Sequence, residues 1–499
     1  MLNALSIGDF DRRKVLIIGD AQIQETPFTE RGLILNKCTL DDASNHFRFA
    51  KAIVVAHQPF QQSLVKDCFE KLFPVAKNYG LAQKVIVHSD KDFGAIMSLA
   101  KGASSDHFYL KERIIELAET IARYSPGPPD NSTRIEGDVA NLDDEAQLVL
   151  RRSFFDCEKI HIKSITGGKD ANHLFKVYAW MKNSEVGPLP LPFFAKISSP
   201  EKINKELQNY RVYTDLYMSF QYRPNCRIER CVQTQKYKSL VGDFVDESIS
   251  LRTALEDIYH SGIIFSLFER SLKSFRIQPF VAGNKPSEGA LSRFIKERIS
   301  IDRLMQRTDV IANAKEFGLT TDVVQLHDRL LKICPSCCMI GPIHGDLNSR
   351  NVMVRGSDAI LIDFSAIYPS GPLTADPATL EVSLSFELGE KEPVPFETWQ
   401  EFVDQAYSPE QLLKPLSLGE QIPNEFSWLR RAIREIRHVL IGCECCGEEI
   451  KAIIACYLMR IARLAPEKAA TEKDKVEFAY RAYALVIAER IILSLENQQ

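Results

Sequence analysis

The sequence has little net charge, and it lacks an apolar run long enough to cross a membrane. Its 62 lysines and arginines almost balance its 66 aspartates and glutamates, which leaves a formal charge of −4. Proteins that bind nucleic acid or anionic membranes usually carry a basic patch, which this balance does not indicate. A membrane-spanning helix needs roughly 20 apolar residues in succession. We therefore expect neither nucleic acid nor a membrane among the partners.

The start of the chain also lacks the apolar segment of a secretory leader, because the first four residues lead directly to Asp9 and Asp11. Without a leader, the 12 cysteines are expected to be free thiols in a cytoplasmic protein. Residues 334–338 contain a Cys-x-x-Cys, and residues 443–446 add three thiols. The second spacing differs from that of a zinc knuckle, so we favour buried thiols over the alternative of a zinc site.

Proline and glycine are concentrated at residues 125–132, in the sequence Ser-Pro-Gly-Pro-Pro-Asp-Asn-Ser. Such a segment cannot form a helix and favours an extended linker. A chain of 499 residues is long enough for several domains. We predict a domain at 1–124, a linker at 125–142 and a second, larger part from 143 to the end.

Apolar runs recur along the predicted first domain, and stretches with helical spacing lie between them. The runs are at residues 15–18, 33–35, 53–56, 85–87 and 108–110. Strands that alternate with helices favour a parallel sheet with helices on both faces. The sequence therefore predicts a small doubly wound α/β domain of the flavodoxin type.

Single residues at the ends of these strands resemble a bacterial response-regulator receiver domain. Asp20, Ser89 and Lys111 follow the first, fourth and fifth strands, where receivers keep an acid, a Ser or Thr, and a Lys. The third strand ends at His57, where the phosphate-accepting Asp of a receiver would be. The resemblance thus implies a degenerate receiver that docks or senses without a phosphoacceptor. A generic flavodoxin-like domain is the alternative.

The clearest candidate for chemistry is the segment at 343–364. It reads as a polar loop, an apolar strand, a turn, and a second apolar strand that ends on an acid. Asp346, Asn351 and Asp363 occupy the positions at which protein kinases keep the catalytic Asp, a metal-binding Asn and the metal-binding Asp. A hairpin whose polar residues only cap turns is the alternative, but it gives no packing reason for a charge at Asp363.

Two departures separate this segment from protein kinases. Gly345 stands where they carry an Arg, and Ser365 stands where they carry the Gly of Asp-Phe-Gly. His-Gly-Asp instead resembles the aminoglycoside phosphotransferase and choline kinase branch of the kinase-like fold. The resemblance implies a two-lobed α+β kinase-like domain. In it, Asp346 would face the acceptor hydroxyl, and Asn351 and Asp363 would hold Mg²⁺ against ATP.

The predicted small lobe, residues 143–247, contains candidates for holding the phosphates of ATP. Gly167, Gly168 and Lys169 lie in a turn between two predicted strands, where glycines let backbone N–H groups approach phosphate oxygens. Lys196 interrupts an apolar strand, and Glu206 lies ten residues later on a predicted helix. A strand lysine paired with a helix glutamate is the kinase arrangement. Glu201 is the alternative partner.

The remaining candidates are backbone groups and helices. In the kinase-like fold, adenine would meet the backbone near Val241 and Phe244. The large lobe would occupy 248–499, which includes a helical C-terminal extension. The run at 380–387 also resembles a bacterial group described as a ternary-complex-associated domain, whose members are expected in multi-protein signalling or conflict systems.

These patterns favour an ATP- and Mg²⁺-dependent phosphotransferase that acts on a hydroxyl or amine of a small molecule or a partner protein. The predicted domain at 1–124 would regulate it by binding a protein partner. The alternative is a catalytically inactive, nucleotide-binding scaffold in a bacterial signalling or defence complex. The sequence does not identify the acceptor.

Overall fold

A computed structural model describes most of the chain, which divides into two compact units. Unit 1 contains residues 1–207 and 225–246, and unit 2 contains residues 208–224 and 247–499. The domain boundaries expected from the sequence stay predictions. The described residues are 13–19, 23–47, 50–56, 61–78, 84–99, 108–123, 132–165, 172–182, 187–234, 236–256, 262–335, 337–389, 391, 393–414, 424–466 and 471–497.

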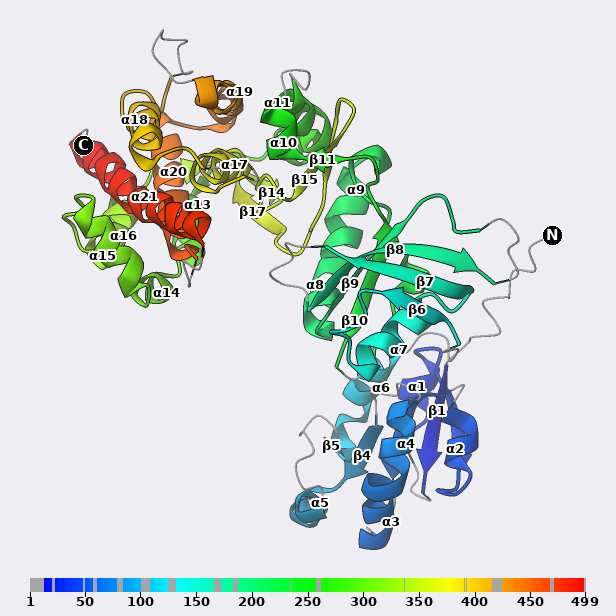
Figure 1. Cartoon of the computed structure of the whole chain (residues 1–499). Helices are drawn as coiled ribbons and strands as arrows, with labels where there is room; N and C mark the ends of the chain where they lie inside the picture. The colour runs from blue at the N-terminus through cyan, green and yellow to red at the C-terminus, as the bar shows by residue number, and fades with distance from the viewer. Residues whose placement is uncertain are drawn as a thin grey trace. The chain divides into compact units, whose positions relative to one another are not determined.

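Unit 1 begins with a five-stranded parallel sheet in the order β2-β1-β3-β4-β5 (Figure 1). Its strands are β1 (Lys14–Ile18), β2 (Ile34–Cys38), β3 (Ala50–Ala56), β4 (Lys84–His88) and β5 (Phe108–Leu110). Val15 and Ile17 pack on one face of the sheet, and Leu16 and Ile18 pack on the other. Both faces are buried because successive side chains of a strand point to opposite sides.

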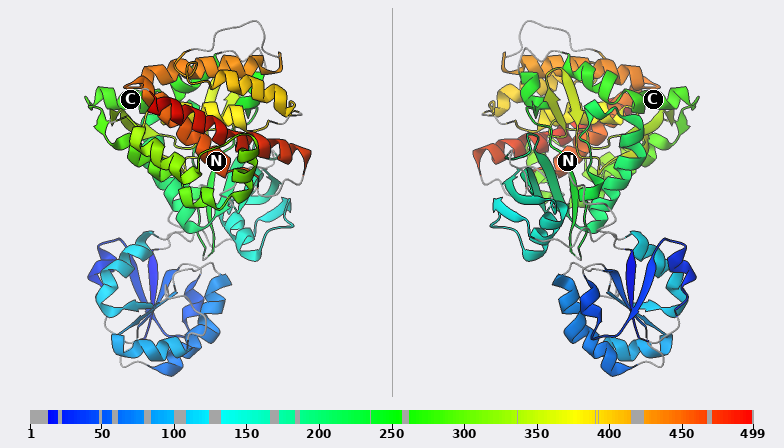
Figure 2. Two further views of the ribbon diagram at one scale, coloured as in Figure 1. Left: turned by 90° about the vertical axis from the view of Figure 1, so that its left-hand side faces the viewer. Right: turned by 90° about the vertical axis from the view of Figure 1, so that its right-hand side faces the viewer.

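Helices cover both faces of this sheet, as the two views of Figure 2 show. One side carries α1 (Thr26–Thr29) and α6 (Ile114–Arg123), and the other carries α2 (Ala43–His46), α3 (Gln62–Asp67), α4 (Phe73–Asn78) and α5 (Phe93–Leu99). The doubly wound α/β domain expected from the sequence is therefore present.

Receiver ancestry stays a prediction. Ser89 follows β4 and donates from its hydroxyl to Asp92, at 2.6 Å, while Lys111 directly follows β5. Asp20 and His57 lie outside the described residues. The sheet alone is common to many flavodoxin-like proteins.

The second sheet of unit 1 has the order β10-β9-β8-β7-β6, and it is antiparallel except for the pair of β6 and β7. The strands are β6 (Arg134–Gly137), β7 (Cys157–Ser164), β8 (His173–Met181), β9 (Phe193–Ser198) and β10 (Lys238–Asp243). Helix α7 (Asp144–Ser153) packs on the apolar face, and Asp143 caps it by accepting from the amide of Ala146 at 2.8 Å. Helix α8 (Pro200–Asn209) follows β9.

Unit 2 is mainly helical, and in its described residues β15 (Val352–Arg355) and β16 (Asp358–Leu361) form a hairpin that β11 (Ile249–Ser250) joins. Its other elements include α10 (Leu251–Glu256), α12 (Lys273–Val281), α13 (Ala290–Arg298), α14 (Ile301–Met305), α15 (Thr308–Glu316), α16 (Val323–Ile333), β14 (Ile340–Ile343), β17 (Tyr368–Pro372), α17 (Ala375–Phe386), α18 (Phe396–Ala406), α19 (Ser427–Cys443), α20 (Gly447–Arg463) and α21 (Glu472–Glu496). No described helix combines the length and apolar character required to span a bilayer.

Helix α17 is the centre of unit 2, because every one of its side chains is buried. Helices α19, α20 and α21 all pack against it. Within this core, Glu381 of α17 forms an ion pair with Arg437 of α19, with Oε1 2.8 Å from Nη2. Arg437 also donates to the carbonyl oxygens of Ala406 at 2.8 Å and Gln411 at 3.1 Å. The guanidinium thus joins α17 and α19 to the end of α18.

Removing one partner of this pair should be far more damaging than removing both. Glu381→Leu leaves the Arg437 charge buried without its carboxylate, which costs about 3–5 kcal/mol in comparable cases. The double variant Glu381→Leu/Arg437→Met replaces both charges by apolar groups and should recover most of that loss. Urea unfolding of the three proteins measures the difference. A double variant no more stable than Glu381→Leu would contradict the pair's proposed contribution.

Candidate active site

The hairpin β15–β16 brings two predicted metal ligands to one end. Val352 pairs with Leu361 in the antiparallel register, and the amide of Ile362 donates to the carbonyl of Asn351 at 3.0 Å. Asp363 is the next residue along the chain. Asn351 and Asp363 are therefore neighbours at the open end of the hairpin, while the turn from Arg355 to Asp358 lies at the other end.

The loop that carries Asp346 is held by a buried carboxylate. Asp376, in the first turn of α17, accepts from the backbone amides of His344 at 2.7 Å and Gly345 at 2.9 Å. Burial raises the pKa of Asp376, and the two N–H donors oppose that rise. His344 is fully buried, and its Nε2 lies 3.1 Å from the carbonyl oxygen of Ile362. The loop is thus tied to α17 on one side and to the hairpin on the other.

The Asp346 side chain is partly exposed and has partners at both carboxylate oxygens. Oδ1 lies 2.7 Å from Nη2 of Arg460 on α20, and Oδ2 accepts from Asn348 Nδ2 at 3.2 Å. Asn351 donates from Nδ2 to the carbonyl of Asp346 at 2.8 Å. These contacts fix the carboxylate that the sequence proposes as the catalytic group, and one of them is a strong charge-assisted bond.

Gly345 has a backbone conformation that explains why glycine stands here instead of arginine. Its φ is +79°, and a Cβ atom would lie 2.2 Å from the carbonyl oxygen of Ala366. An arginine reaches the same place from another element, because Arg298 of α13 donates from Nη2 to the carbonyl of Gly345 at 2.7 Å. Any side chain at 345 would displace this contact.

Asp363 has a φ of +60°, which non-glycine residues rarely adopt. Its Oδ1 accepts from the amide of Ser365 at 3.2 Å, and Asn209 donates to the carbonyl of Phe364 at 2.9 Å. The ring of Phe364 packs against those of Tyr210 and His344. Backbone strain of this kind costs of order 1–3 kcal/mol and is concentrated at functional sites.

The side chains at the open end of the hairpin fit a magnesium ion. Because Asn351 directs its Nδ2 at the carbonyl of Asp346, its amide oxygen is left for a cation. With the Asp363 carboxylate this gives two hard oxygen ligands, which Mg²⁺ prefers and normally supplements with phosphate oxygens and water. Among the described residues, no group of three or more His, Cys, Asp or Glu side chains is placed to hold a metal. All 12 cysteines are free thiols.

In unit 1, Lys196 of β9 and Glu206 of α8 form a buried ion pair, with Nζ 2.8 Å from Oε2. Their side chains are only 10% and 7% exposed. Lys196 lies in the middle of the sheet, opposite Leu240 of β10 and Leu174 of β8. Glu201, the alternative partner considered from the sequence, is exposed.

Of the other predicted nucleotide contacts, some lie outside the described residues and the rest already form hydrogen bonds within the protein. Gly167, Gly168 and Lys169 lie outside the described residues, between the end of β7 and the start of β8. The carbonyl of Val241 accepts from the amide of Arg227 at 2.8 Å, and the amide of Phe244 donates to the carbonyl of Pro192 at 3.0 Å. Adenine recognition through these two groups would compete with existing hydrogen bonds.

Three residues with clear structural roles at the Asp346 loop were missed in the sequence: Asp376, Arg298 and Arg460. Of the three, only Asp376 could have been recognised from the sequence, because it is an acid in the first turn of an apolar helix. The two arginines lie 47 and 114 residues from their partners in the loop. Their contacts arise from helix packing, which no local pattern reports.

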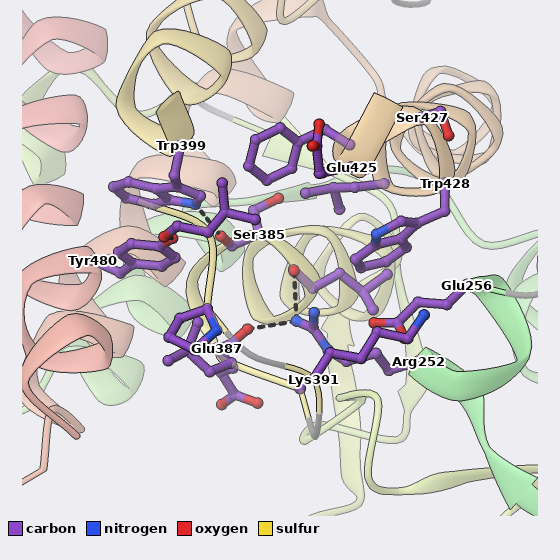
Figure 3. A pocket seen from close by; sticks show the side chains of 17 residues that line it. Arg252, Glu256, Ser385, Glu387, Lys391, Trp399, Glu425, Ser427, Trp428 and Tyr480 are labelled. Atoms are coloured by element: carbon purple, nitrogen blue, oxygen red, sulfur yellow. Dashed lines mark hydrogen bonds and ion pairs between the residues drawn. The ribbon is translucent and has the colours of Figure 1, made fainter. Parts of the chain in front are cut away.

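A separate cavity of about 390 Å³ lies at the C-terminal end of α17 (Figure 3). The stacked rings of Trp399 and Tyr480, with centroids 3.8 Å apart, face it from one side, and Trp428 faces it from another. Arg252 donates to the carbonyls of Leu384 at 2.7 Å and Glu387 at 2.5 Å. Asp376 is at the opposite end of α17, so this cavity is distinct from the site at Asp346.

Comparison with known families matches residues 320–445 to the model for Ternary complex associated domain 9. The matched region includes the hairpin, α17 and all of α19. The predicted resemblance to this domain group is therefore confirmed for that part of the chain. A search of curated proteins found no match.

Comparison with solved structures finds kinases of the branch that the sequence resembles. A thermostable mutant of aminoglycoside phosphotransferase APH(4)-Ia is 12% identical, with a TM-score of 0.39, and covers 67% of this chain and 94% of its own. A choline kinase from Cryptosporidium parvum is 15% identical, with a TM-score of 0.34 and coverages of 68% and 89%. Plasmodium vivax ethanolamine kinase is 14% identical, with a TM-score of 0.36 and coverages of 82% and 95%. Likenesses this distant do not establish a function.

Replacing Gly345 by alanine should destabilise unit 2 more than the same change at Gly356. Both glycines have positive φ, so alanine at either position should lower the free energy of unfolding by roughly 1–2 kcal/mol through its left-handed backbone conformation. Only at 345 does the new Cβ also collide with a backbone oxygen, whereas no atom lies within 4 Å of a Cβ at 356. Thermal unfolding of the two variants compares them. Equal losses of stability would mean that the close approach to Ala366 does not constrain the loop.

Proposed function

We propose that this chain is an ATP- and Mg²⁺-dependent phosphotransferase that moves the γ-phosphoryl group to a hydroxyl or amine acceptor. The observation that carries the proposal is the arrangement at the hairpin: a carboxylate held in a loop, an amide oxygen left for a cation, and a strained Asp363 beside it. Phosphoryl transfer needs positioning and charge stabilisation more than covalent chemistry, and these groups supply both.

Each residue has a defined role in this proposal. Lys196, oriented by Glu206, would bind the α- and β-phosphates, and Gly167, Gly168 and Lys169 would cover them. Asp346 would accept the proton of the acceptor. Asn351 and Asp363 would hold Mg²⁺, which neutralises phosphate charge when it is bound.

A second candidate function is a nucleotide-binding scaffold without catalysis. The ion pair of Asp346 with Arg460 favours it, because a carboxylate oxygen held by a guanidinium is not free to contact an acceptor hydroxyl. The match to a ternary-complex-associated domain fits a protein that assembles with partners. In either case, we propose that a cytoplasmic protein partner binds the domain at 1–124.

Removing the Asp346 carboxylate should lower turnover strongly while leaving the fold intact. Asp346→Ala is expected to lower kcat by about 10²–10⁴, the usual contribution of a general base. Asp363→Ala should remove the response to Mg²⁺. Release of phosphate from γ-labelled ATP, with and without a metabolite extract as acceptor source, measures both. Asp358→Ala, on the same hairpin at its other end, is the control and should stay active.

The scaffold is favoured if the wild-type chain binds Mg-ATP but neither releases nor transfers phosphate with any extract. A residual rate that Asp346→Ala leaves unchanged would have the same meaning.

Breaking the lysine–glutamate pair should weaken ATP binding selectively. Glu206→Gln removes the carboxylate that orients Lys196, and loss of a charge-assisted bond corresponds to roughly a 10- to 100-fold increase in the Kd for ATP. Glu201→Gln changes an exposed glutamate in the first turn of the same helix and should have no effect. Calorimetric titration with Mg-AMP-PNP provides the measurement. Equal Kd values for the two variants would exclude the proposed role of Glu206.

A further inference from the structure

The side of unit 2 that faces Asp346 is unusually rich in arginine. Helix α20 ends with Arg460 and Arg463, which lie three residues apart and therefore on the same face of the helix. Helix α14, which carries Arg303, packs against α20. Arg298, at the end of α13, is bonded to the Asp346 loop through the carbonyl of Gly345. Arg460 and Arg298 thus contact the candidate catalytic loop, and Arg463 and Arg303 lie on α20 and on the helix packed against it.

These charges influence one another. Burial lowers the pKa of Arg463, and the nearby Arg460 and Arg303 lower it further. Burial also opposes the charge of Arg460, but Asp346, together with Tyr457, reverses this effect and raises its pKa. The guanidinium groups are therefore close enough to repel each other, and Asp346 is the acid that stabilises Arg460.

The negative charge available to this cluster is too small. In the part of the chain that the structure describes, Arg460 is paired with Asp346, while Arg463 and Arg303 form no ion pair with an acid. Arg463 is partly buried, so water screens its charge only in part. Arg303 is exposed to solvent, so the unpaired charge that most favours an anionic ligand is that of Arg463.

We propose that the acceptor of the phosphotransferase is a small hydroxy compound that carries a phosphate or carboxylate group. Arg463 and Arg303 bind that anion, and Arg460 exchanges its bond with Asp346 for one with the ligand. This inference rests on the proposed function, and it names the substrate class of the same site. The Asp346 side chain is 34% exposed and that of Arg460 17%, so the contact is recessed and suits a small molecule better than a protein surface.

The exchange explains why a catalytic carboxylate is paired in the structure. While Arg460 holds Oδ1, that oxygen is not available to the hydroxyl of a ligand. When the ligand's anion takes Arg460, the carboxylate is free to accept the proton of the ligand's hydroxyl. The hydroxyl oxygen of the ligand then forms a bond to the γ-phosphorus of ATP. The bond from that phosphorus to the β,γ-bridging oxygen breaks, and ADP leaves with the electron pair.

Direct binding of hydroxy anions tests this inference without requiring turnover. The probes are glycerol 3-phosphate and 3-phosphoglycerate, with glycerol as the uncharged control and choline as the cationic one. Calorimetric titrations are carried out on the full chain with saturating Mg-AMP-PNP. We expect at least one of the two anions to bind, and we expect glycerol and choline not to bind.

Arginine variants assign the binding to the cluster. Arg463→Gln should weaken anion binding by about tenfold, as expected for the loss of one charge-assisted contact. Arg355→Gln removes an exposed arginine at the end of β15 and should bind like the wild type. Arg460→Gln should also weaken anion binding. If Arg460→Gln does not fold, Arg463→Gln alone is sufficient to test the cluster.

Three results would overturn the inference. In the first, neither anion binds more tightly than glycerol, and this includes the case in which only an acidic peptide binds. The second is equal affinity for Arg463→Gln and Arg355→Gln. The third is competition between the anions and Mg-AMP-PNP, which would assign the arginines to the nucleotide. The titrations measure binding and do not depend on phosphoryl transfer. A protein that binds these anions but transfers no phosphate would therefore contradict the proposed function and not the anion site.

Discussion

The placement of the candidate catalytic loop depends on one carboxylate. Asp376 accepts from two successive backbone amides, those of His344 and Gly345, and no other described group takes these donors. Buried N–H groups without a partner are costly, so the loop has a single favourable position relative to α17. Helix α17 is itself buried along its whole length and is joined to α19 by the Glu381–Arg437 pair. The candidate catalytic loop is thereby anchored in the core of unit 2 and not in its surface.

The same anchoring accounts for the positive φ of Asp363, which is strained, and for that of Gly345, which as a glycine is not. Gly345 and Asp363 both have positive φ, and both adjoin residues whose backbone groups are bonded to buried partners. A strained residue persists only when its surroundings determine its conformation more strongly than its own preference does. Here those surroundings are the hairpin, the buried His344 ring and the first turn of α17.

Local patterns in the sequence were sufficient to predict some of this arrangement. Asp363 was selected because it is an acid that directly follows an apolar strand. Lys196 was selected because it is a lysine inside an apolar strand. Apolar runs alternating with helical spacing predicted the first sheet, because parallel strands are buried on both faces. The contacts of Arg298 and Arg460 were not predictable in this way. They depend on where α13 and α20 pack after folding, and an arginine near a helix terminus usually points to solvent.

The close approach of Gly345 to Ala366 has a consequence for how this motif can change. A His-Arg-Asp triplet cannot be produced by one replacement at 345, because the new side chain would meet both the Ala366 carbonyl and the guanidinium of Arg298. The Arg298 guanidinium can move aside, because it is the end of a flexible side chain, but the backbone at Ala366 cannot do so without a rearrangement of the loop. The residue at 345 can therefore change only together with the path of the chain after Asp363.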